Sequence, residues 1–96
     1  MRFELDFSED ADQTLDNLEN FNYKKYKKIA NALNKMQTNL RHPSLQTHKY
    51  NDLSGPNGEE VFECYAENKT PGAWRIFWYY GPGKGVLTIV AITPHP

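Results

Sequence analysis

The chain has 96 residues, enough for one domain with one hydrophobic core and too few for a second domain beside it. Apolar residues make up 39% of the sequence and aromatic residues 14%, which is more than a disordered chain carries. The formal net charge is only −1, but this total conceals a strong segregation of charge along the chain. We therefore expect residues 1–96 to form a single folded domain.

The cysteine and apolar content exclude several classes of protein. The single cysteine, Cys64, cannot form an internal disulfide, and no Cys and His residues have the spacing of a structural zinc site. The first residues lack the apolar core of a signal peptide, and no stretch approaches the roughly 20 apolar residues that span a bilayer. We expect a cytoplasmic protein with no membrane segment, no metal and no cofactor.

Acidic residues gather at the start of the chain and basic residues in its middle. Residues 1–20 hold seven acidic residues and one arginine, a net charge of −6. Residues 21–51 hold seven basic residues and no acidic one, and the remaining residues hold three basic and five acidic ones. This segregation indicates either ion pairing between two neighbouring helices or a basic face that meets phosphates.

Hydrophobic periodicity predicts a strand followed by two helices. Apolar and charged residues alternate over residues 3–7, the period of a half-buried strand. Ser8 is the expected N-cap of a helix that runs from about Glu9 to Glu19. A second helix is predicted from near Tyr23 to Arg41 or His42, because the proline that follows pushes the preceding residue out of helical geometry.

The second half of the chain is predicted to be a β-meander. Residues 44–59 are polar and rich in turn-forming residues, so we expect a loop. Strands are predicted over residues 61–67, 73–80 and 86–93, separated by turns rich in Gly and Pro. The order strand, helix, helix, strand, strand, strand predicts a two-layer α+β fold with the helical hairpin on one face of the sheet. The pattern leaves open where the first strand pairs.

Three short motifs in this order resemble the RelE/ParE toxin superfamily. They are His42-Pro43-Ser44-Leu45-Gln46-Thr47-His48-Lys49 after the second helix, Trp74-Arg75-Ile76-Phe77 in the middle of the meander, and Ile92-Thr93-Pro94-His95 at the end of the last strand. The family commonly has a Leu-x-x-His-Lys-Leu element, an Arg-(Ile/Val)-x-(Phe/Tyr) strand and a last strand that closes on a histidine or a basic residue. The resemblance covers essentially the whole chain.

The resemblance implies a bacterial toxin of a type II toxin-antitoxin system with a RelE-like fold. Ribonuclease members cut messenger RNA in the ribosome and so inhibit translation, which makes an endoribonuclease the expected activity. The partners implied are a cognate antitoxin protein, the ribosome and mRNA. Two alternatives stay open: a ParE-like inhibitor of DNA gyrase, and a non-catalytic protein-binding module of the same fold. The first strand of the meander has Glu60 and Glu63 where some ribonuclease members have lysines.

RNA cleavage through the 2′-hydroxyl needs a base or an orienting group, cations for the phosphoryl oxygens and an acid for the leaving oxygen. Arg75 is the first candidate, because its guanidinium can hold two phosphate oxygens; the alternative is a surface arginine paired with Glu63 or Glu67. His95 is the candidate acid, and His48 is a candidate for proton transfer or for fixing its loop. Glu63 is expected to orient Arg75 or to act as the base.

Further residues are candidates for contact with RNA. Lysines and an arginine would bind phosphates, and a tyrosine that shares the face of Arg75 would stack on a base. These candidates are Lys24, Lys25, Lys28, Arg41, Lys49 and Tyr79.

Overall fold

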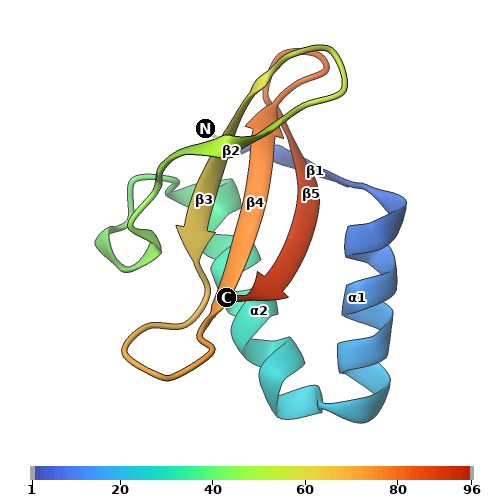
Figure 1. The fold of residues 1–96 in the computed structure, drawn as a ribbon, viewed down its shortest axis with the longest axis vertical. Coiled ribbons are helices and arrows are strands. Elements are labelled where there is room, and N and C mark those ends of the chain that lie inside the picture. Colours follow the sequence, from blue (N-terminus) through green and yellow to red (C-terminus); the bar gives the residue numbers. More distant parts are fainter. Residues whose placement is uncertain (1, 96) are drawn as a thin grey trace.

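One five-stranded sheet carries two helices on one of its faces (Figure 1). The structure is a computed structural model that describes residues 2–95. Its elements are β1 (Glu4–Phe7), α1 (Glu9–Phe21), α2 (Tyr23–Thr38), the short 3-10 helix η1 (Pro43–Leu45), β2 (His48–Ser54), β3 (Glu60–Tyr65), β4 (Trp74–Tyr80) and β5 (Val86–Pro94). The strand order is β1-β5-β4-β3-β2. The predicted two-layer α+β architecture is confirmed.

The first strand lies at one edge of the sheet, beside the last strand. β1 is parallel to β5, with Glu4 opposite Val86 and Phe7 opposite Ile89, and the other neighbouring strands are antiparallel. Ser8 caps α1 as predicted, because its Oγ accepts a hydrogen bond from the backbone N–H of Ala11 at 3.0 Å. The same hydroxyl donates to the carbonyl of Val90 at 2.9 Å, which fastens the start of α1 to β5.

The second helix is shorter than predicted. The sequence predicts that the helix ends at Arg41 or His42, whereas α2 ends at Thr38. Asn39 leaves the helical conformation with φ −154° and ψ 77°. The approach of the N-terminal segment explains the early end: the backbone N–H of Phe3 donates to the Gln37 carbonyl at 2.9 Å, and Gln37 Nε2 donates back to the Phe3 carbonyl at 3.1 Å. The last turn of α2 is thus hydrogen-bonded to the segment that precedes β1.

The prediction of a loop over residues 44–59 holds for residues 55–59 and is wrong for residues 48–54. His48–Ser54 forms β2, which pairs antiparallel with β3 and places His48 opposite Glu63. The sheet therefore has four successive antiparallel strands instead of three. β2 is an edge strand that is exposed over most of its length, with an irregular register between Tyr50 and Ser54, so it lacks apolar alternation. His48 and Lys49 consequently lie on a strand.

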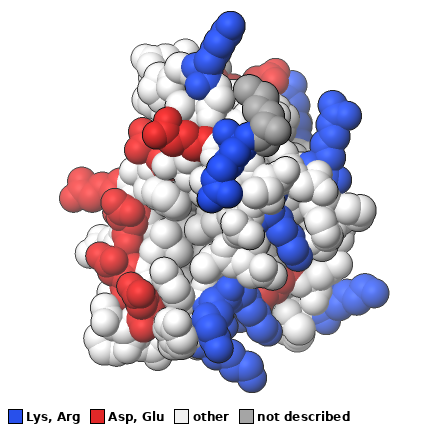
Figure 2. All heavy atoms as spheres, turned by 180° about the vertical axis from the view of Figure 1, so that it is seen from behind, with Lys and Arg blue, Asp and Glu red and all other residues white. Residues whose placement is uncertain are grey.

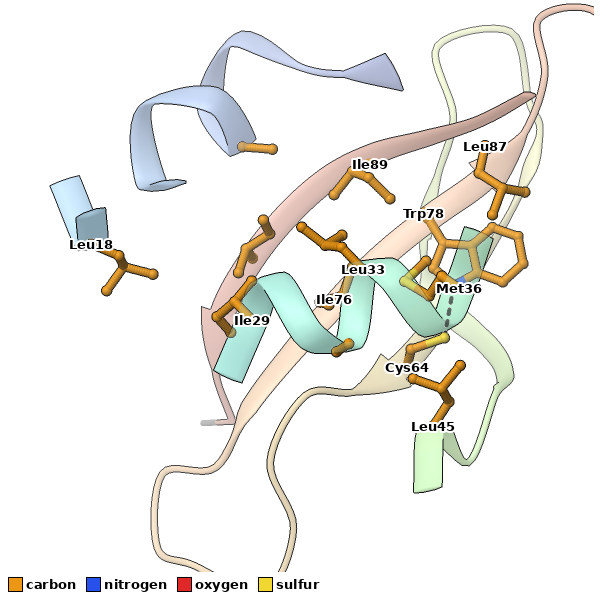
Figure 3. Close-up of a cluster of buried hydrophobic side chains, with 13 residues drawn as sticks. Leu18, Ile29, Leu33, Met36, Leu45, Cys64, Ile76, Trp78, Leu87 and Ile89 are labelled. Carbon is orange, nitrogen blue, oxygen red and sulfur yellow. Dashed lines mark hydrogen bonds between the residues drawn. The ribbon is translucent and has the colours of Figure 1, made fainter. Parts of the chain in front are cut away.

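The core fills the space between the helices and one face of the sheet (Figure 3). Met36 of α2 and Trp78 of β4 are fully buried in it, and Trp78 Nε1 donates to Cys64 Sγ at 3.1 Å. Burial raises the pKa of the Cys64 thiol above its ordinary value, although hydrogen bonds with Thr47 and Trp78 act in the opposite direction. Because side chains alternate along a strand, the neighbours of the core residues point to the other face of the sheet.

Within residues 2–95, no helix has the length and hydropathy needed to cross a membrane.

Candidate functional site

The sheet face opposite the helices collects polar and aromatic side chains from three strands. Register places Glu63 of β3 opposite His48 of β2, and Arg75 of β4 opposite Tyr65 of β3. On its other side Arg75 is paired with Thr93 of β5. Strand pairing therefore brings together a histidine, a carboxylate, a tyrosine and an arginine that lie up to 27 positions apart in the sequence.

The Arg75 guanidinium is held by backbone carbonyls. Its Nη1 donates to the carbonyls of Glu67 at 2.9 Å, Ala73 at 3.3 Å and Trp74 at 3.4 Å, and the guanidinium carbon lies 3.6 Å from the centre of the Tyr65 ring. Arg75 is 8% exposed, and its Nε is buried without a hydrogen-bond partner among residues 2–95. One amino group thus anchors the side chain, while the buried Nε faces the Glu63 carboxylate at 3.8 Å.

Glu63 lies between this guanidinium and His48. Its Oε1 is 2.6 Å from His48 Nε2, and its Oε2 is 3.8 Å from Arg75 Nε, beyond hydrogen-bond distance. His48 Nδ1 lies 2.7 Å from the Gln46 carbonyl oxygen. Because that oxygen can only accept, Nδ1 is the donor to it, and Nε2 faces the Glu63 carboxyl group. The row His48, Glu63, Arg75 therefore combines a proton-transfer pair with a fixed cation.

His95 lies next to the start of β4. It is exposed, and its backbone N–H donates at 2.8 Å to the carbonyl of Ala73, the oxygen that also accepts from Arg75 Nη1. The four residues proposed as catalytic are thus brought to one region of the sheet: three form a connected row, and the backbone of the fourth is tied to the arginine's anchor.

A hollow of about 260 Å³ lies on this face between β2 and β5. Its wall includes Tyr50, Leu53, Phe77 and Thr93, and the rings of Tyr50 and Phe77 meet edge to face with their centres 4.8 Å apart. The proposed catalytic side chains stand beside the hollow and do not line it. Within residues 2–95, no group of three or more His, Cys, Asp and Glu side chains has an arrangement that could hold a metal ion.

Two lysines of α2 pair with Glu67, which follows β3, and not with α1. Lys25 Nζ lies 2.6 Å from Glu67 Oε1, and Lys28 Nζ lies 3.4 Å from Glu67 Oε2. Within the described residues no ion pair joins the two helices, so the predicted alternative of helix-helix pairing is not what the fold uses. Seen from the helix side, acidic side chains line one edge and basic ones gather at the foot of the molecule (Figure 2). Lys24, Lys25 and Lys28 with Asn22 enclose a hollow of about 290 Å³ there.

The other candidates for RNA contact lie apart from one another. Lys49 makes an exposed ion pair with Glu60 at 2.7 Å. Arg41 is exposed after the end of α2 and lines a separate cavity. Tyr79 is only 6% exposed, so it presents little ring surface for stacking on a base.

Two further residues complete the site: the sequence named Glu67 only as an alternative partner of Arg75, and it did not indicate Tyr65. Tyr65 supplies the ring under Arg75, and the alternation that links it to Glu63 on the same strand was the available signal. Glu67 supplies a carbonyl to Arg75 and a carboxylate to Lys25. Burial raises the pKa of Glu67, but hydrogen bonds from Lys25 and the backbone of Trp74, with the charge of Lys25, more than offset it, so the pKa lies below its ordinary value.

The fold of this chain is similar to that of three solved structures. A structure of a RelE-RelB complex from Pyrococcus horikoshii OT3 is similar to this chain with TM-score 0.67 and 10% identity, over 98% of this chain and 96% of that one. The structure of the YoeB/ParE toxin from Agrobacterium tumefaciens is similar with TM-score 0.70 and 9% identity, over 97% of this chain and 99% of that one. The structure of a YoeB dimer from Staphylococcus aureus is similar with TM-score 0.64 and 16% identity, over 100% of both chains.

No family model matches the chain, and no curated protein matches its sequence. The likeness is thus one of fold at very low sequence identity.

Proposed function

We propose that this chain is the toxin of a toxin-antitoxin pair and that it cuts mRNA on the ribosome. The observation that carries the proposal is the row His48, Glu63, Arg75 on the open face of a RelE-like sheet. A carboxylate between two basic groups, one of them a fixed guanidinium with an unsatisfied N–H, suits a reaction that moves a proton and develops charge on a phosphate.

In the proposed reaction the 2′-oxygen of one nucleotide attacks the adjacent phosphorus. The new 2′-O–P bond forms as the P–O5′ bond breaks, leaving a 2′,3′-cyclic phosphate and a 5′-hydroxyl. The positive charge of the Arg75 guanidinium stabilises the charge that develops on a non-bridging oxygen. Glu63 Oε2 takes the proton of the 2′-hydroxyl, and His48 holds the carboxylate through Oε1. His95 supplies the proton to the departing 5′-oxygen.

Contacts outside the row would hold the RNA. The hollow enclosed by Lys24, Lys25 and Lys28 is suited to the ribosomal RNA backbone, because these cations bind phosphates without sequence preference. Lys49 follows His48 on the edge strand β2, so its side chain points to the other face and would contact the messenger backbone at the edge of the sheet. A ribosomal target puts the protein in the cytoplasm.

The partner proposed to restrain the toxin is a small antitoxin protein. Support comes from one of the similar structures, which is a RelE-RelB complex. We expect the antitoxin to cover the Arg75 face, because shielding this row would block access of RNA to all the proposed catalytic groups.

The test is cleavage of a defined mRNA on programmed ribosomes, with mapping of new 5′ ends. The wild type should cut, and Arg75→Gln should reduce the rate at least about 100-fold, the usual loss when one donor to a developing oxyanion is removed. Lys84→Gln, on the exposed loop after β4, is the matched control and should cut like the wild type.

Two results would overturn the proposal. Growth inhibition without new 5′ ends, accompanied by gyrase-linked DNA breaks, would favour a ParE-like toxin. Unchanged activity in Arg75→Ala and His95→Ala would favour a non-catalytic module.

A further inference from the structure

A second cavity, of about 730 Å³, opens at the C-terminal end of α2, and its wall includes Gln46 and Thr47, which precede His48. Residues 38–43 form one side of it, and Phe3 and Tyr80 form another. Tyr80 ends β4 five residues after Arg75, which separates the two along the strand by about 16 Å. None of the four residues proposed as catalytic lines this cavity.

Tyr80 offers this cavity a fixed aromatic surface. Its side chain is 53% exposed, although it packs against three other rings. Ring centres lie 6.3 Å away for Phe3, 5.6 Å for Phe62 and 4.9 Å for Trp78. An exposed ring that neighbouring rings hold in place is a stacking platform, because its conformational freedom is already lost before a flat ligand arrives.

The charges around the cavity select a particular kind of ligand. Arg41 and His42 are in its wall, and no acidic residue is. The C-terminal end of α2, at Thr38, carries partial negative charge and therefore attracts hydrogen-bond donors instead of a bare anion. A ligand that fits has a flat ring for Tyr80, donor groups for the helix end and the amides of Asn39 and Gln46, and an anionic group for Arg41.

We propose that this cavity binds one nucleotide of single-stranded RNA, with its base stacked on Tyr80 and its phosphate at Arg41. A nucleobase with its exocyclic amino group supplies the flat ring and the donors, and the phosphodiester supplies the charge. The inference rests on the proposed function, since it adds a second contact to the same RNA substrate. It makes Tyr80, in place of the buried Tyr79, the stacking residue of β4.

The experiment titrates the full chain with adenosine, cytidine, guanosine and uridine 5′-monophosphates in the absence of ribosomes, followed by NMR of backbone amides. Signals of residues 38–43, Phe3 and Tyr80 should move. Tyr80→Leu should weaken binding about tenfold, and Tyr80→Phe should retain it, since every base has a face that can stack. Arg41→Gln should weaken binding of the nucleotides but not of the parent nucleosides.

Matched controls separate this cavity from the rest of the surface. Tyr23→Leu removes another exposed tyrosine, on α2 and outside the cavity, and should bind nucleotides like the wild type. Thermal unfolding of each variant reports whether it is folded.

Nucleotides that move no signals, or that move only signals on the open sheet face, would overturn the inference. If the protein shows no nucleotide binding at this cavity but still cuts mRNA on the ribosome, the proposed function stands without the nucleotide site. Binding at the cavity by a chain that cuts no RNA would retain this site and remove the catalytic proposal.

Discussion

Arg75 and His95 are joined through a single oxygen atom, because the Ala73 carbonyl accepts hydrogen bonds from Nη1 of the arginine and from the backbone N–H of the histidine. The bond from residue 95 to Ala73 uses the backbone N–H, so a substitution of the imidazole leaves this bond in place.

Replacing His95 with alanine should lower the rate of mRNA cleavage about 100-fold, a typical contribution of a general acid. The midpoint of thermal unfolding reports any loss of stability, which the remaining bond from the backbone N–H to the Ala73 carbonyl should limit. Cleavage on programmed ribosomes and differential scanning calorimetry measure the two effects. A variant that cuts at the wild-type rate would remove His95 from the mechanism.

The His48–Glu63 pair should stabilise the fold. Glu63 is 7% exposed, so His48→Gln weakens the hydrogen bonding of a buried carboxylate and should cost about 1 to 2 kcal/mol. For a domain of this size, that lowers the unfolding midpoint by about 5 to 10 °C. A double-mutant cycle with Glu63→Gln should give a coupling energy of about 1 kcal/mol.

Lys49→Gln is the control for this cycle, because it removes the neighbouring ion pair with Glu60, in which both side chains are more than half exposed. It should leave the midpoint nearly unchanged. Equal losses for His48→Gln and Lys49→Gln would contradict a specific role of the His48–Glu63 pair.

Glu67 should make stability depend on pH in the acid range. Its pKa in the folded protein is below the ordinary value of 4.5, so its contribution is present above about pH 4.5 and is lost as the pH falls through the lowered value. The stability difference between the wild type and Glu67→Gln should therefore be largest near neutral pH and shrink in acid. Urea unfolding from pH 7 to pH 3 measures it. Glu19→Gln, an exposed acid of α1, should show no such difference.

The Cys64 thiol should be unreactive in the native protein. It is fully buried, and its pKa is raised by that burial, so little thiolate forms at pH 8. Reaction with a disulfide reagent should be slow in buffer and fast in guanidinium chloride. Fast reaction under native conditions would show that the contact with Trp78 opens readily.

Alternating or helical hydrophobic patterns predicted β1, both helices and β3 to β5, since each of these elements buries one face against the core. β2 was not predicted, because an exposed edge strand owes its conformation to pairing with β3 and not to its own residues. The end of α2 was misplaced because bonds to Phe3 stop the helix. Both errors come from contacts between segments distant in sequence.

In the candidate site, too, some residues could be predicted from the local sequence and others depend on contacts between distant segments. Arg75, His48 and Glu63 could be named from residue type and motif, and the structure joins them in one row. Tyr65 and Glu67 acquire their roles only through strand register, which places one beside Arg75 and the other within reach of Lys25. The burial of Tyr79 also follows from packing that alternation alone does not reveal.

The pairing of β1 with β5 joins two segments that lie far apart in the sequence. Ser8 reaches its partner Val90 across 82 positions, so a growing polypeptide cannot pair β1 until β5 has been synthesised. A product that ends before β5 also lacks the strand that pairs with β4 beside Arg75. The sheet face that carries Arg75 is therefore completed only after β5 is made.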